Sequence, residues 1–134
     1  MILIDTSIWI EFLKAKSLYY DEVSNLLEEN RVLALSCIFG ELLQGAKNKR
    51  ERTIIQDLWT YLPKVDEHHL FIKAGLESGI KKWTDKGVGL IDSVIITSAR
   101  QTNAKIWTLD KKIQSILKPN EQYPFVPHNP PTAD

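Results

Sequence analysis

The strongest constraint on the fold is a set of short strand-like runs, each followed by a residue suited to begin a helix. The runs Met1 to Ile4 and Val32 to Leu35 are apolar and are followed by Asp5 and Ser36, and the β-rich run Lys105 to Leu109 is followed by Asp110. Asp and Ser are preferred helix N-cap residues, and apolar runs of this length are typical of strands covered on both faces. Each step therefore predicts a buried strand that leads directly into a helix.

Amphipathic helices are predicted between the strands, because apolar residues recur at spacings of three and four. The residues that carry this pattern are Ile8, Trp9, Phe12 and Leu13, then Tyr19, Val23, Leu26 and Leu27, then Ile38, Phe39, Leu42, Leu43 and Ala46, and then Ile54, Ile55, Leu58, Trp59 and Leu62. A longer helix is predicted from a cap at Asp66 to about Trp83, with Leu76 and Ile80 sharing a stripe with Trp83. A last long helix is expected from about Leu90 to Gln101.

Strands that alternate with helices and lack hairpin signals predict an α/β fold, with a mostly parallel sheet and helices on both of its faces. Weaker strand candidates at Lys64–Val65 and Tyr123–Val126 bring the expected number of short strands to four or five. A chain of 134 residues suits a single core. We therefore expect one domain over residues 1–127 and a flexible, proline-rich tail over residues 128–134.

Charge and cysteine content exclude several classes of protein. The 17 basic and 17 acidic residues cancel, so any binding of nucleic acid has to come from a local patch. Cys37 is the single cysteine, which excludes an internal disulfide and a multi-cysteine zinc site, and His68, His69 and His128 lack a second ligand at metal-site spacing. Charge interrupts the apolar N-terminal stretch early and no basic region precedes it, so a cytoplasmic location is expected.

Two acidic residues stand directly after predicted strands. Ligands of open α/β sheets bind at the carboxyl ends of the strands, where Asp5 and Asp110 are expected. Taken alone, each is better explained as a helix cap. Two carboxylates at equivalent positions of separate strand–helix units favour a shared site.

Asp92 and Glu41 are candidates for the same site. Asp92 shares a predicted helix face with the apolar Ile95 and Ile96. A buried carboxylate is costly unless it is neutralised, hydrogen-bonded or bound to a metal, so Asp92 either points into a polar pocket or caps its own helix. Glu41 lies at the border of an apolar helix face beside Leu42, where an ordinary boundary residue is an equally good explanation.

The four acids together are stronger evidence for a cation site than any one of them alone, because carboxylates brought close together resist ionisation unless a cation lies among them. Hard oxygen ligands without His or Cys favour Mg²⁺ or Mn²⁺. Such an ion activates water for in-line attack on a phosphodiester and stabilises the charge that develops. We therefore interpret Asp5, Glu41, Asp92 and Asp110 as catalytic residues and metal ligands of a phosphodiester hydrolase.

The four acids lie in four short motifs, which are Ile4-Asp5-Thr6-Ser7-Ile8-Trp9, Gly40-Glu41-Leu42-Leu43-Gln44-Gly45, Gly89-Leu90-Ile91-Asp92-Ser93 and Thr108-Leu109-Asp110-Lys111. In this order the motifs resemble those of the PIN domain, and more narrowly those of the VapC-type toxins of type II toxin–antitoxin systems. The resemblance extends from Met1 to about Val126. No single motif is specific, so the signal comes from their number and order.

The resemblance implies a Rossmann-like sheet, Mg²⁺- or Mn²⁺-dependent endoribonuclease activity, a homodimer and a cognate antitoxin that blocks the site. By position, the four acids match the family's acidic quartet, and Thr6 or Ser7 matches its hydroxyl beside the first Asp. Lys112 and Ile113 stand where the family often has a second acid and an aromatic residue. This departure leaves it open whether Asp110 binds the metal directly or through water.

The densest basic cluster follows the helix that holds Glu41. It comprises Lys47, Lys49, Arg50 and Arg52, and we consider these residues as contacts for RNA phosphates. A solvated helix start explains the cluster equally well. Lys14, Lys81, Lys82 and Arg100 are weaker candidates for the same role.

Two other functions fit parts of the sequence. A receiver-like phosphotransfer domain also has carboxylates at strand ends, but it needs a phospho-accepting Asp after a middle strand, and Ser36 follows Val32–Leu35 here. A non-catalytic PIN-like module for RNA or protein binding would use the same fold. The presence of all four acids argues against that module.

Overall fold

The computed structural model describes residues 1–15 and 17–126, which surround a small parallel sheet. The strands are β1 (Ile2–Ile4), β2 (Val32–Leu33) and β3 (Lys105–Trp107), in the order β2-β1-β3 with both pairings parallel. Isolated parallel bridges, Ala34 to Lys64 and Ile106 to Gln122, extend the pairing at either edge. They lie at or next to the two weaker strand candidates, and the predicted α/β class with a parallel sheet is confirmed.

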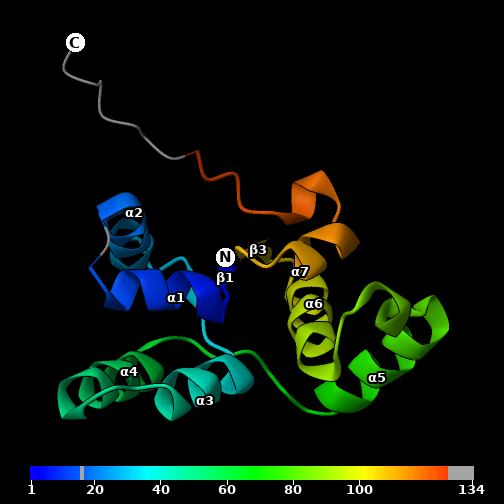
Figure 1. Ribbon diagram of the computed structural model, residues 1–134, viewed down its shortest axis with the longest axis horizontal. Coiled ribbons are helices and arrows are strands. Elements are labelled where there is room, and N and C mark those ends of the chain that lie inside the picture. The colour runs from blue at the N-terminus through cyan, green and yellow to red at the C-terminus, as the bar shows by residue number, and fades with distance from the viewer. Residues whose placement is uncertain (16, 127–134) are drawn as a thin grey trace.

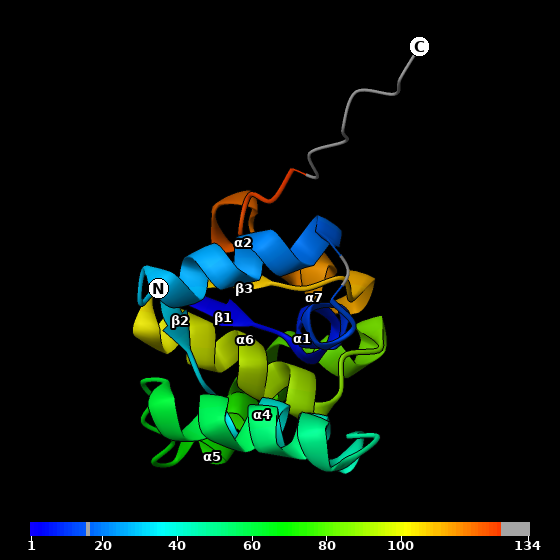
Figure 2. The same ribbon diagram turned by 90° about the vertical axis from the view of Figure 1, so that its left-hand side faces the viewer.

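Helices lie on both faces of the sheet. They are α1 (Thr6–Leu13), α2 (Ser17–Glu28), α3 (Ser36–Gln44), α4 (Lys49–Tyr61), α5 (Leu70–Lys81), α6 (Leu90–Thr102) and α7 (Lys111–Ile116), with 3₁₀ turns at Trp83–Lys86 and Pro119–Glu121. In Figure 2, α2 runs over one face of the sheet and α6 over the other. α3 and α4 form a pair beside α1, and α5 packs on the outer side of α6 (Figure 1).

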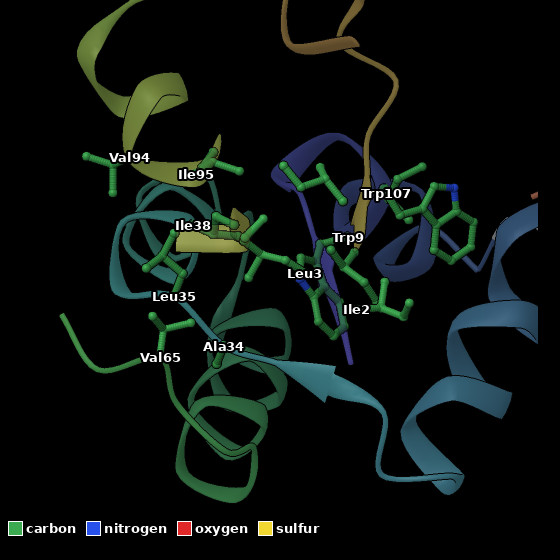
Figure 3. Close-up of a cluster of buried hydrophobic side chains, with 14 of the residues drawn as sticks. Ile2, Leu3, Trp9, Ala34, Leu35, Ile38, Val65, Val94, Ile95 and Trp107 are labelled. Carbon is green, nitrogen blue, oxygen red and sulfur yellow. The ribbon is translucent and has the colours of Figure 1, made fainter. Parts of the chain in front are cut away.

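The core forms where both faces of β1 are covered. Ile2, Leu3 and Ile4 are all buried, as expected for an apolar strand between two helix layers. Figure 3 shows Leu3 among side chains from separate elements, including Ile38 of α3 and Ile95 of α6. This packing fixes the carboxyl ends of β1 and β3 relative to the helices that follow them.

The helix predicted from Asp66 to Trp83 is wrong at both ends. The Oδ1 atom of Asp66 accepts a hydrogen bond from the backbone N–H of His68 at 3.1 Å, and the N-cap position of α5 is His69. Lys82 ends the helix, because its φ of 56° is left-handed and cannot continue an α-helix. Trp83 begins the separate 3₁₀ turn.

The face that α5 buries also differs from the predicted stripe. Leu70, Ala74 and Ser78 are buried on the side facing the rest of the molecule, whereas Leu76 and Ile80 are exposed. Small side chains at two of these three positions let α5 approach α6 closely. The helical period was correct, but a period does not say which of two faces packs inward.

The start of α3 is capped by a distant residue and not by Ser36. Leu35 occupies the N-cap position, and Ser36 is the first helical residue. The carboxylate of Glu67 accepts hydrogen bonds from both the backbone N–H and the hydroxyl of Ser36. Glu67 therefore provides a hydrogen-bond acceptor for a backbone N–H that has no partner within the helix, at the start of the helix that carries Glu41.

Among the described residues, none of the helices has the length and apolar character needed to cross a membrane. The predicted tail, residues 128–134, lies outside the described residues, as does His128.

Candidate acidic site

Asp5 is a buried carboxylate at the carboxyl end of β1, with 7% of its surface exposed. It occupies the N-cap position of α1, yet its side chain makes no capping hydrogen bond. Its Oδ2 atom instead accepts hydrogen bonds from the hydroxyls of Thr108, at 2.7 Å, and Ser7, at 3.1 Å. The helix-cap explanation therefore does not account for the Asp5 carboxylate.

The same two hydroxyls hold the segment that follows β3. Thr108 Oγ1 accepts a hydrogen bond from the backbone N–H of Asp110 at 2.9 Å, and Ser7 Oγ accepts one from the backbone N–H of Leu109 at 3.0 Å. Asp5 and Asp110 thus share Thr108 as a common partner. Sequence reasoning placed Thr108 in the motif that precedes Asp110 but assigned it no role, since a hydroxyl near the end of a strand is common.

Glu41 reaches the Asp5 segment from α3. Its side chain is exposed, and its Oε1 atom accepts a hydrogen bond from Thr6 Oγ1 at 3.2 Å. Thr6 directly follows Asp5 in the chain, so this contact brings Glu41 to the end of β1. The two hydroxyls considered from the sequence, Thr6 and Ser7, contact different acids.

Asp92 lies in the first turn of α6, where Gly89 and not Asp92 holds the N-cap position. Its side chain is half-buried. Burial raises the pKa of the Asp92 carboxyl above its ordinary value, and the negative charges of Asp110, Asp5 and Glu41 raise it further. A hydrogen bond with the backbone of Gly89 acts in the opposite direction. The four acids therefore share one electrostatic environment, with Asp92 among the other three.

Asp110 does cap a helix. Its Oδ1 atom accepts a hydrogen bond from the backbone N–H of Lys112 at 2.8 Å, at the start of α7. The helix-cap explanation thus holds for one oxygen of this residue, although its charge also acts on Asp92. Of the four acids, Asp110 is the one whose presence can be explained by helix capping alone.

The comparisons with known proteins identify the family of the chain. The family model described as PIN domain matches residues 2–118. This chain belongs to the PIN domain family. Members of the family are generally nucleases that use divalent metal ions.

Solved structures resemble this PIN domain over most of its length. The crystal structure of VapBC2 from Rickettsia felis, bound to a DNA fragment from their promoter, contains a chain with 25% identity and a TM-score of 0.68, and the match covers 91% of this chain and 96% of that one. The FitAcB structure from Neisseria gonorrhoeae matches at 18% identity and a TM-score of 0.57, over 84% and 90% of the two chains, and it supports the fold alone. A search of curated proteins found no significant match.

The donor set of this PIN domain suits a hard divalent cation, because the four acids supply only oxygen ligands. Over residues 1–15 and 17–126, no group of three or more Asp, Glu, His or Cys side chains is already arranged to hold a metal ion. Mg²⁺ does not need such a group, since it keeps several waters and takes one or two carboxylates. The repulsion felt by Asp92 is the physical feature that a cation would remove.

The predicted basic cluster lies where α3 turns into α4. Lys47, Lys49, Arg50 and Arg52 are all exposed. Lys47 and Glu41 line the same cavity, of about 270 Å³, between α1 and the α3–α4 corner. Lys47 is therefore the member of the cluster placed nearest to the acids by a shared cavity.

Three of the weaker phosphate candidates have other partners, and one of them, Lys14, lies 3.9 Å from Glu11. Arg100 bonds Glu121 through Nε at 2.8 Å and Glu77 through Nη1 at 3.3 Å, and it lies over the ring of Trp83. Lys81 pairs with Glu77 at 2.7 Å. These contacts argue against phosphate binding by Arg100 and Lys81.

Proposed function

We propose that this PIN domain is an endoribonuclease that depends on Mg²⁺ or Mn²⁺ and acts in the cytoplasm as the toxin of a type II toxin–antitoxin pair. The observation that carries the proposal is the environment of Asp92, whose carboxyl is half-buried and repelled by Asp5, Glu41 and Asp110. Such repulsion does not stabilise the fold, whereas a cation bound among the acids would relieve it. The motif resemblance to VapC-type toxins supports RNA as the substrate.

The proposed ligands differ in how firmly they are held. Asp5 is fixed by the hydroxyls of Thr108 and Ser7 before any ion binds. Asp92 faces the other acids from α6, and Glu41 adds an exposed carboxylate that Thr6 orients. Asp110 uses one oxygen to cap α7, which favours a second role at the metal through water. A bound divalent ion supplies stabilisation of phosphate charge and makes a coordinated water more acidic.

The chain's own groups would place the RNA backbone. Lys47 shares a cavity with Glu41 and is suited to bind a phosphate that flanks the scissile bond. Lys49, Arg50 and Arg52 are exposed on the same corner and extend that positive surface. Binding through phosphates positions an RNA without reading its sequence.

An antitoxin groove is proposed between α1, α2 and the α3–α4 corner. Two cavities lie there, of about 270 and 300 Å³, and both are lined by Leu13 and Glu51. The apolar residues that line one or the other are Ile10, Phe12, Leu42, Ala46, Tyr20 and Ile54. This surface suits the apolar face of an amphipathic partner helix. Because Glu41 lines one end, a basic side chain of the partner would enter the acidic site there.

RNA cleavage tests the nuclease proposal. A panel of structured RNAs, with single-stranded DNA alongside, is incubated with the protein plus Mg²⁺ or Mn²⁺, and with chelator. We expect metal-dependent cleavage of RNA and a loss of at least a hundredfold in Asp5→Asn and Asp92→Asn. Asp57→Asn, at an exposed acid on α4, is the matched control and should cleave normally. Cleavage that persists in chelator and in both site variants would defeat the mechanism.

Expression in cells tests the toxin proposal separately. Induction of the wild-type chain should slow growth, and Asp92→Asn should not. Co-expression of a partner that binds the groove should restore growth, and Leu13→Glu should weaken that rescue because it places a charge between the two cavities. Normal growth with a soluble, RNA-cleaving wild-type protein would contradict the toxin role while leaving the nuclease proposal intact.

A further inference from the structure

Four aromatic side chains gather at the outer edge of β3. They are Tyr19 of α2, Trp107 of β3, and Tyr123 and Phe125 of the segment after the second 3₁₀ turn. The Trp107 ring lies 6.2 Å from Tyr19, 5.1 Å from Tyr123 and 4.8 Å from Phe125, measured between ring centroids. Figure 3 shows the Trp107 ring on the side of β3 that faces α2. The four rings therefore form one cluster between α2 and the C-terminal segment.

The C-terminal segment is held in place beside β3. The backbone N–H of Tyr123 donates a hydrogen bond to the carbonyl of Ile106 at 2.8 Å. In Figure 1 this orange to red segment runs from the side of α7 toward the side of α2, and Phe125 reaches Tyr19 there, with 5.6 Å between the ring centroids. Rings from three separate parts of the chain thus converge on one place.

The aromatic cluster does not fill its own space. A cavity of about 230 Å³ lies among the rings, and Gln114 of α7 and Gln122 also line it. This volume is below the roughly 300–1,000 Å³ of pockets that hold drug-sized ligands, so the cavity suits a single flat group. The ring planes are inclined by 36° to 49°, so they neither stack on one another nor meet edge to face. A flat group that enters between them would gain aromatic faces to stack on.

The chemistry of the cavity indicates what kind of flat group fits. All of the described residues that line it are uncharged. Gln114 Nε2 donates a hydrogen bond to the carbonyl of Thr108 at 2.8 Å, which orients the amide and leaves its oxygen and a second N–H for other partners. Burial and the charge of Glu22 raise the pKa of the Tyr123 phenol, so this ring stays neutral. Neutral rings with amide groups beside them suit a nucleobase better than a phosphate or a metal ion.

Thr108 connects this cavity to the acidic site. It lines the cavity, and its Oγ1 atom donates a hydrogen bond to Asp5 at 2.7 Å and accepts one from the backbone N–H of Asp110 at 2.9 Å. Leu109 lines the cavity as well, and its side chain is 44% exposed. A nucleotide whose phosphate lies at the acids would therefore have its base within reach of the cavity.

We propose that this cavity, which we call the base pocket and define by Tyr19, Trp107, Gln114, Tyr123 and Phe125, binds one unpaired base of the RNA beside the bond that is cut. The inference rests on the proposed nuclease function and states what that site requires of its substrate. The base next to the scissile phosphate leaves its stack and enters between the aromatic rings. A base held in a duplex cannot do so, and the same bond within a duplex would resist cleavage.

An aromatic side chain of a partner protein is the rival occupant of the base pocket. The position of the pocket favours RNA, because Thr108 places it against Asp5 and Asp110, where the scissile phosphate is proposed to bind. The groove proposed for the antitoxin is lined instead by residues of α1, α2 and the α3–α4 corner. The two surfaces therefore have different occupants in this proposal.

A fluorescent base tests the pocket without relying on cleavage. Asp92→Asn is mixed with short single-stranded RNAs that span a bond cut by the wild type, each carrying 2-aminopurine at a different position. The fluorescence of 2-aminopurine falls when it stacks, so we expect strong quenching at one position beside the cut bond. Phe125→Leu in the same background should lose that quenching, and Phe125→Tyr should keep it because a ring is retained. Tyr61→Leu, at a residue 72% exposed on α4, is the matched control and should quench normally.

An abasic nucleotide at the quenched position separates stacking from a structural role. Phe125→Leu should weaken binding of the intact RNA by about tenfold, the size of a lost base–aromatic stack. It should leave binding of the abasic RNA unchanged, because the stacked pair is already missing there. Equal weakening for both RNAs would mean that Phe125 only supports the fold, and it would reject the base pocket.

The remaining outcomes distinguish the pocket from the proposed function. Failure of the wild type to bind or cleave any RNA would reject the nuclease function and the base pocket with it. Normal RNA cleavage with the same quenching at every position would reject the base pocket alone. Weaker antitoxin binding by Phe125→Leu, with RNA binding unchanged, would assign the cavity to the partner protein and would equally overturn the proposal.

Discussion

Asp92 is the residue at which the acidic site opposes the stability of the metal-free protein. Burial and the charges of Asp110, Asp5 and Glu41 raise the pKa of its carboxyl in the folded state. A raised pKa means that the charged form is disfavoured by folding, so the cost is present above the folded pKa and vanishes below the unfolded value of about 3.9. We therefore predict that Asp92→Asn in chelator raises the melting temperature at pH 7.5, with a gain that shrinks to zero as the pH falls below 4. Calorimetry across this pH range measures the gain, and a lower melting temperature for Asp92→Asn at pH 7.5 would refute it.

The Cys37 thiol, which is not one of the proposed metal ligands, is also affected by burial and by nearby negative charges. Burial, followed by the charges of Glu67 and Glu41, raises the pKa of its thiol to about 12. Because the thiolate is the reactive form, we predict that iodoacetamide alkylates the folded chain at pH 8.5 on the order of a hundredfold more slowly than the chain in 8 M urea. Mass spectrometry reports on this site directly, since Cys37 is the only cysteine. Equal rates in both states would show that the thiol is neither shielded nor repelled.

At the scale of single elements, the end of α5 holds strain that a substitution can release. Lys82 has φ 56° and ψ 43°, a left-handed conformation that costs a residue with a Cβ atom about 1 kcal/mol and that glycine adopts freely. We predict that Lys82→Gly stabilises the fold by roughly 0.5–1 kcal/mol, or about 2–5 °C in melting temperature. Lys81→Gly is the matched control and should destabilise, because Lys81 is helical and pairs with Glu77. A loss of stability in Lys82→Gly would mean that its side chain matters more than its backbone.

The elements also show which features a sequence can predict. The alternation of strands and helices could be predicted because the strands lie in short apolar or β-rich runs and each run is followed by a residue suited to start a helix, as at Ile4 and Asp5. The residue that caps α3 could not be predicted from the sequence, because Glu67 and Ser36 are 31 residues apart and only the folded chain brings them together. The buried face of α5 could not be predicted from the sequence either. Ala74 and Ser78 are buried because α6 packs against them, and the sequence of α5 alone does not show that contact. Local patterns thus predicted the elements, and long-range contacts decided their caps and faces.

The sequence allowed the candidate acids to be identified for a related reason. Carboxyl ends of parallel strands meet at one edge, so Asp5 and Asp110 were expected near each other, and Thr108 now joins them. The partners of the acids were harder to predict, because hydroxyls such as Thr108 are frequent and their hydrogen bonds depend on atomic positions. Whether the four acids act as metal ligands stays a prediction.

At the scale of the whole molecule, the acidic site draws its members from distant parts of the chain, from Asp5 after β1 to Asp110 before α7. An ion that needs several of them binds only the folded chain, so it stabilises the fold in proportion to its affinity. At ten times its dissociation constant, this linkage gives about 1.4 kcal/mol, and we predict a rise of about 5 °C in melting temperature with Mg²⁺ or Mn²⁺. Differential scanning fluorimetry measures the rise, with NaCl at equal ionic strength as the control for simple screening.

Asp92 makes this prediction discriminating, because its two effects have opposite signs. Without metal, Asp92→Asn should melt at a higher temperature than the wild type, since the repulsion is gone. With Mg²⁺ or Mn²⁺, the same variant should gain nothing, since a proposed ligand is gone, and the wild type should overtake it. Asp57→Asn should follow the wild type in both conditions, as an exposed acid far from the site in sequence. A carboxylate with a purely structural role would shift both curves in one direction, so parallel curves for wild type and Asp92→Asn would exclude a cation at this site.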